Sequence, residues 1–67
     1  MRSQVDKTAQ YLRDSILEGQ LRPNQLLVTS EIASQLGLSR TPIREAIQRL
    51  LQEGYVGKLE NGMVVVV

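Results

Sequence analysis

The 67-residue sequence predicts a mostly α fold in which three helices are followed by a small β-hairpin. Three observations predict it. Apolar residues recur at helical spacing in three separate segments, a glycine stands at the end of each segment, and an Asn-Gly pair divides the last apolar stretch into two short strands. A chain of this length has room for one small domain, so residues 1–67 are expected to form a single unit.

The first helix is predicted over roughly residues 3–18, and Gly19 is a suitable stop. Residues 22–25 are predicted to form a turn, because Pro presets φ at the second position and Asn24 tolerates the positive φ that a type II turn requires at the third. Residues 25–28 are apolar enough for a brief strand. The inward face of the helix carries four apolar residues at helical spacing: Val5, Ala9, Leu12 and Ile16.

Two further helices follow in quick succession. Thr29 is placed to cap the first, which stops at Gly37. The second runs from about Ser39 to Glu53, and Pro42 is compatible with it because N–H groups in the first helical turn have no acceptor within the helix. The inward residues are Ile32, Ala33 and Leu36 in the first helix, and Ile43, Ala46, Ile47, Leu50 and Leu51 in the second.

Residues 55–67 are predicted to form two strands joined at Asn61-Gly62. A type I′ turn needs positive φ at both of its central positions, and Asn-Gly is the pair that best supplies it. The order of elements is therefore helix, short strand, helix, helix and hairpin. This order defines a winged helix-turn-helix, with three helices, a short strand and a two-stranded wing.

The composition argues against catalysis. The chain has no His and no Cys, so the most common general base, the thiolate nucleophile and most metal ligands are missing. Its seven carboxylates are scattered, and the domain is expected to need no cofactor and no metal. No apolar run reaches the ~20 residues that span a bilayer, so we expect a cytoplasmic protein without membrane association. The net charge of +1 does not by itself indicate a nucleic-acid partner.

The paired helices carry the most informative pattern. Ala33 stays small where the second helix crosses the first, and Gly37 suits the turn between them. A helical hairpin without a ligand shares this spacing. The outward face of the second helix favours DNA binding, since Arg, Thr and Gln side chains hydrogen-bond to base edges and to phosphates. That face carries Thr41, Arg44, Glu45, Gln48 and Gln52, with Arg40 at its exposed N-terminal end.

Residues 36–47, Leu-Gly-Leu-Ser-Arg-Thr-Pro-Ile-Arg-Glu-Ala-Ile, resemble the signature of GntR-family regulators. The resemblance extends over almost the whole chain, and the Ser-Arg-Thr-Pro run is similar to the FadR-type subgroup, whose members respond to small organic acids. It implies a winged helix-turn-helix domain that binds duplex DNA in a bacterial transcription regulator, more often a repressor than an activator. Asn24 replaces the usual Gly after Pro, and Ser30 stands where several members carry Arg.

The resemblance also implies the residues that contact DNA. Arg40 and Arg44 match arginines that enter the major groove, where a guanidinium reads O6 and N7 of guanine. Ser39 and Thr41 match phosphate contacts at a helix N-terminus, although Ser39 also suits a cap. Arg49 is equally suited to a DNA contact and to an ion pair. The remaining candidates lie at the start of the preceding helix, on the outward face and in the wing: Thr29, Ser30, Gln48, Lys58, Asn61 and Gly62.

Members of the family carry a larger C-terminal domain that binds an effector and dimerises, so this chain is expected to be a fragment. In the full-length protein a homodimer would read a palindromic operator, and a small organic-acid effector is expected only on the missing domain. A self-sufficient small regulator would need a dimer interface that the sequence does not reveal. The alternative function is a winged-helix module for protein contacts, with the apolar strand at residues 63–67 as its docking edge.

Overall fold

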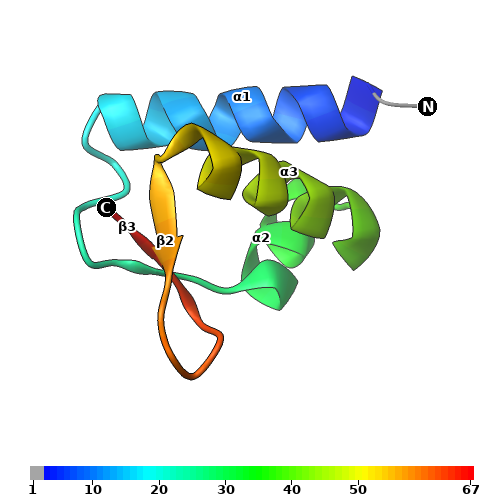
Figure 1. Ribbon diagram of the computed structural model, residues 1–67. Coiled ribbons are helices and arrows are strands. Elements are labelled where there is room, and N and C mark those ends of the chain that lie inside the picture. The colour runs from blue at the N-terminus through cyan, green and yellow to red at the C-terminus, as the bar shows by residue number, and fades with distance from the viewer. Residues whose placement is uncertain (1–2) are drawn as a thin grey trace.

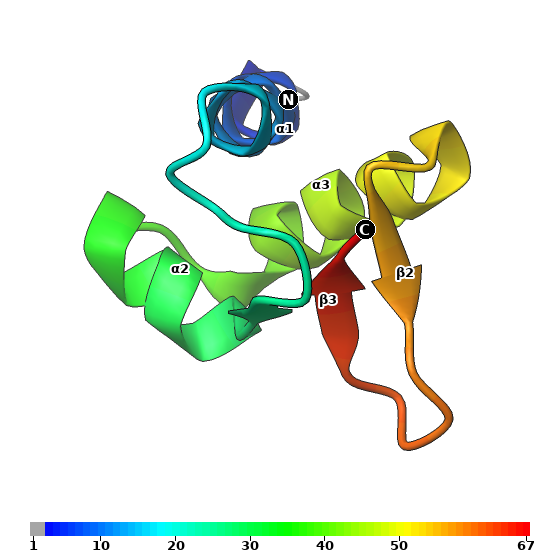
Figure 2. The same ribbon diagram turned by 90° about the vertical axis from the view of Figure 1, so that its left-hand side faces the viewer.

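The computed structural model describes residues 3–67 and confirms the predicted order of elements (Figure 1). Each predicted boundary is met within about two residues, the scatter expected for assigned helix and strand ends. Figure 2 shows α3 beneath α1, with the wing strands extending away from α1. The elements are α1 (Ser3–Leu17), β1 (Leu26–Leu27), α2 (Thr29–Leu36), α3 (Arg40–Glu53), β2 (Val56–Lys58) and β3 (Val64–Val66).

The inward faces of the helices and the sheet meet in one aliphatic core. Leu12 of α1, Leu50 of α3 and Val66 of β3 are each 1% exposed or less. All the apolar residues predicted to face inward are buried or half-buried. The periodicity missed two buried polar residues of α1, Thr8 and Ser15. The Ser15 hydroxyl is accommodated because it donates to the Tyr11 carbonyl oxygen one turn earlier, at 2.8 Å.

A three-residue connection, 37–39, joins α2 to α3 in the helix-turn-helix. Gly37 adopts φ 68°, a left-handed conformation that lets the Leu38 N–H donate to the Ala33 carbonyl at 3.0 Å and close the end of α2. Ser39 is the N-cap residue of α3, but it makes no side-chain cap bond. The prediction that Thr29 caps α2 is wrong. Val28 holds the N-cap position in an extended conformation, and Thr29 is already the first helical residue.

The C-terminal strand is the central strand of the sheet. The order is β1-β3-β2, with both pairings antiparallel. β3 is therefore not a docking edge, as the protein-contact alternative required. β1 occupies its second side, with Leu26 opposite Val65. The chain before β1 extends this pairing, because the Asn24 N–H donates to the Val66 carbonyl at 2.8 Å and the Val66 N–H donates to the Gln25 carbonyl at 3.0 Å.

The wing tip differs from the predicted type I′ turn. Among residues 3–67, Asn24 is the one non-glycine residue with positive φ, at 71°, as predicted for that position. Asn61 lies outside this region, and its Oδ1 accepts from the Met63 N–H at 3.0 Å. Gly62 has φ 89°, and its N–H donates to the Leu59 carbonyl at 2.9 Å. The tip is a three-residue loop, 60–62, that ends in a left-handed glycine.

Candidate nucleic-acid interface

The outward face of α3 is arranged as its sequence predicts. Burial of Ile43 and Ala46 turns the opposite side of the helix to solvent. The predicted side chains of that side are all exposed: Arg40, Thr41, Arg44, Glu45, Gln48 and Gln52. Arg40 and Arg44 lie one turn apart, so two guanidinium groups follow the same side of the N-terminal half of α3.

A shallow groove runs between α3, the first turn of α2 and the wing, with a volume of about 340 Å³. Ile47, Leu51 and Val64 form its apolar floor. The wing contributes to it because Lys58 pairs with Val64 across the two strands, which places both side chains on the sheet face that meets α3. The groove brings together five predicted site residues that are distant in sequence: Thr29, Arg44, Gln48, Lys58 and Gly62.

The other predicted site residues lie around this groove rather than in it. Ser30 is exposed in the first turn of α2, and Ser39, Arg40 and Thr41 are exposed where α3 begins. Asn61 is exposed at the wing tip. Their exposure makes them accessible to a ligand, while their contacts with DNA stay predictions.

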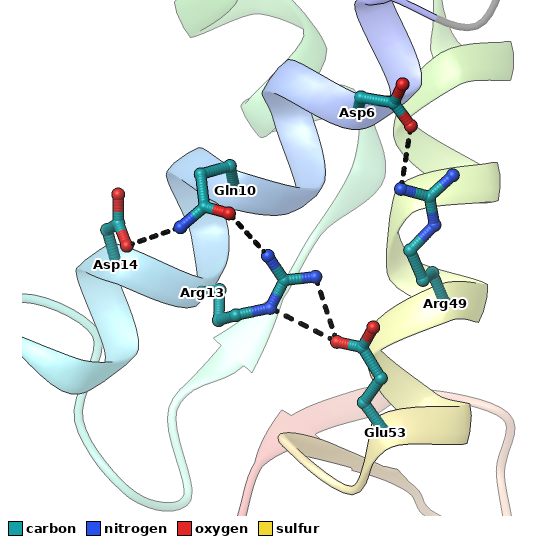
Figure 3. A network of polar contacts seen from close by, with 6 residues as sticks. All are labelled: Asp6, Gln10, Arg13, Asp14, Arg49 and Glu53. Atoms are coloured by element: carbon teal, nitrogen blue, oxygen red, sulfur yellow. Dashed lines mark hydrogen bonds and ion pairs between the residues drawn. The ribbon is translucent and has the colours of Figure 1, made fainter.

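The structure shows which of the two roles predicted for Arg49, a DNA contact or an ion pair, the side chain fills. Its Nη1 donates to Oδ1 of Asp6 on α1 at 2.8 Å, so Arg49 is an ion-pair partner (Figure 3). A second pair joins the same two helices: Nη2 of Arg13 lies 2.9 Å from Oε1 of Glu53. Sequence reasoning did not find Asp6 because the pair joins positions 43 residues apart. Only the crossing of α1 over α3 brings them together.

Two further observations concern other ligands. Within residues 3–67, no three Asp or Glu side chains gather in a way that would hold a metal ion. In the same part of the chain no helix has the length and apolar character needed to cross a membrane. The expectation that the domain uses no cofactor stays a prediction.

The fold and the groove define the class of protein. A helix whose exposed N-terminal half carries arginines, supported by two helices and flanked by a wing, is the architecture of a DNA-binding winged helix-turn-helix domain. The family model described as bacterial regulatory proteins, gntR family, matches residues 4–66, and the chain belongs to this family.

Known relatives agree with this assignment. An uncharacterized HTH-type transcriptional regulator in an unstable DNA locus of Streptomyces ambofaciens is 44% identical over 45 residues, which cover 67% of this chain and 19% of the relative. The crystal structure of a GntR-family regulator from Pseudomonas syringae pv. tomato DC3000 matches with a TM-score of 0.83 at 29% identity, over 96% of this chain and 27% of that one.

A second structure, the AraR DNA-binding domain in complex with operator ORR3, matches with a TM-score of 0.84 at 26% identity, over 96% of this chain and 78% of that one. The matched segment covers 19% of the length of the Streptomyces ambofaciens relative and 19% of a second curated relative, the Nta operon transcriptional regulator of Aminobacter aminovorans.

Proposed function

We propose that this domain reads an operator in duplex DNA, with α3 in the major groove. The observation that carries the proposal is the groove beside α3, where Arg44 and Lys58, from a helix and a strand, line one surface with Gln48. The major groove is wide enough to admit an α-helix, and the flanking cations would then lie near the phosphates. The likeness to a domain whose structure contains operator DNA supports the same conclusion.

The residues divide between base reading and phosphate contact. Arg40 and Arg44 are assigned to guanines, because a planar guanidinium donates two parallel hydrogen bonds to O6 and N7. Gln48 lies one turn beyond Arg44, and its amide suits an adenine edge. The phosphate contacts are assigned to the first turns of α2 and α3, where free N–H groups and the helix dipole favour anions. These contacts comprise Thr29, Ser30, Ser39 and Thr41.

The wing is assigned a supporting role. Lys58 neutralises a phosphate beside the groove, while Asn61 and Gly62 approach the minor groove. The exposed Glu60 adds a negative charge at the tip, so the wing contributes less electrostatic attraction than a basic tip would. Most of the binding free energy is therefore assigned to α3.

At the level of the whole regulator, we propose a repressor that dimerises and reads a palindrome in the cytoplasm. A FadR-type organization, with a small organic-acid effector bound by a separate C-terminal domain, accounts for the greater length of the relatives. A second half-site raises the effective concentration of the second reading domain, so the single domain is expected to bind DNA weakly.

Site selection from a pool of random duplexes tests the base-reading roles. We expect wild type to enrich one short sequence, and Arg44→Ala and Arg40→Ala each to lose preference at one position, with a loss of about 1–3 kcal/mol in discrimination. Arg22→Ala is the matched control, because it removes an equal charge from an exposed residue of the turn before β1. Selection of the same site with undiminished preference by both α3 variants would contradict the assignment.

A further inference from the structure

The two ion pairs between α1 and α3 have different surroundings. Arg49 lines a hollow on the outward side of α3 together with Glu45, Gln48 and Gln52. Arg49 therefore lies at the border of the surface assigned to DNA. Figure 3 shows the second pair farther along both helices, toward their C-terminal ends. There the Arg13 side chain lies over the Tyr55 ring, with the guanidinium carbon 5.7 Å from the ring centroid.

The Asp6–Arg49 pair is also the more accessible of the two. The side chains of Asp6 and Arg49 are 60% and 29% exposed, against 38% and 19% for Glu53 and Arg13. Arg49 reaches Asp6 through one nitrogen, at 2.8 Å, whereas Arg13 reaches Glu53 through two, at 3.1 and 2.9 Å. An exposed pair held in this way is weak. A phosphate near the flank of α3 would compete for the same guanidinium.

We propose that Asp6 limits the number of DNA phosphates that α3 neutralises, because its carboxylate engages Arg49 and withholds that guanidinium from the DNA backbone. The inference rests on the proposed placement of α3 in the major groove, where each flank of the helix faces a row of phosphates. Asp6 is thus a positioning residue that tunes affinity through Arg49. It lies on α1, outside the helix-turn-helix itself.

The salt dependence of binding measures this effect directly. Each phosphate neutralised adds about 0.9 to the slope of log K against log salt. We measure that slope for the 67-residue chain on a random-sequence duplex. Asp6→Asn is expected to steepen it by about 0.9, which corresponds to a further loss of about 3.5-fold in affinity between 50 and 200 mM salt. Asp6→Glu retains the carboxylate and is expected to keep the wild-type slope.

Two controls separate the mechanism from general electrostatics. Glu53→Gln removes the same charge and releases Arg13 instead of Arg49, and we expect no change in slope. Asp6→Asn in an Arg49→Gln background should leave the slope at its wild-type value, because no guanidinium remains to be released. Arg49→Gln alone should also keep that slope, since Arg49 is already withheld; this variant tests the proposal even if Asp6→Asn impairs folding.

Three results would overturn the proposal: an unchanged slope in Asp6→Asn, a steeper slope that persists in the double variant, or a reduced slope in Arg49→Gln. A reduced slope in Arg49→Gln would show that Arg49 already neutralises a phosphate in wild type. These outcomes differ from failure of the proposed function. If wild type bound no duplex at any salt concentration, DNA reading by this domain would itself be wrong, and the role of Asp6 with it.

Discussion

Asn24 and Asn61 lie in loops and have different backbone conformations. Substitution by glycine is expected to change the stability of the domain differently at the two positions. Asn24 has φ 71°, in the left-handed region that costs most L-residues about 1–2 kcal/mol, that Asn adopts at a lower cost, and that costs glycine little. Glycine in turn raises the entropy of the unfolded chain, which costs about 0.5–1 kcal/mol. The two terms nearly cancel in Asn24→Gly. We expect its free energy of unfolding to stay within about 0.5 kcal/mol of wild type.

Asn61 lies outside the left-handed region, so glycine offers it no relief of strain. Asn61→Gly also removes the acceptor of the Met63 N–H, a bond that contributes about 0.5–1.5 kcal/mol. Adding the entropic cost of glycine, about 0.5–1 kcal/mol, gives an expected loss of about 1–2.5 kcal/mol. In a domain of this size each kcal/mol lowers Tm by about 4–8 °C.

Thermal and urea unfolding, followed by circular dichroism, measures the difference in the free energy of unfolding between the two variants. Equal m-values establish that the variants expose the same surface on unfolding. A type I′ turn would hold Asn61 at positive φ, and both variants would then respond alike. If Asn61→Gly proved as stable as Asn24→Gly, the three-residue wing loop would be refuted.

Two further predictions address the core and the wing. Ile43 is fully buried on the inward face of α3. Ile43→Ala is therefore expected to lower the free energy of unfolding by about 2–5 kcal/mol and Ile43→Val by about 0.5–1.5 kcal/mol; equal urea midpoints for the two would contradict this packing. Lys58→Gln should weaken binding to all duplexes alike and lower the salt slope by about 0.9; a slope equal to that of wild type would remove Lys58 from the DNA interface.

The sequence was sufficient for features that depend on a few neighbouring residues. Helical periodicity placed the inward residues of α3, and the left-handed conformations of Asn24 and Gly37 followed from the short-range preferences of Asn and Gly. The outward arginines followed from the same periodicity. These features are set within one or two helical turns, so the amino-acid order alone carries the information.

Local preference was not sufficient where two backbone solutions suit the same residues. Thr29 suits both the N-cap and the first helical turn, and the chain placed the cap at Val28. The pair Asn61-Gly62 suits both a two-residue and a three-residue wing loop. The cross-strand register, with Lys58 opposite Val64, leaves five residues between the paired positions and fixes the longer loop.

Only the tertiary structure decided which distant segments meet. The sequence by itself determined the three helices, the glycine stops, the wing and the exposed face of α3. The packing of α1 across α3 then paired Arg49 with Asp6, and the pairing of β1 with β3 made β3 the central strand. The physical reason is that contacts between remote residues depend on the relative placement of whole elements, and the periodicity within one element does not specify that placement.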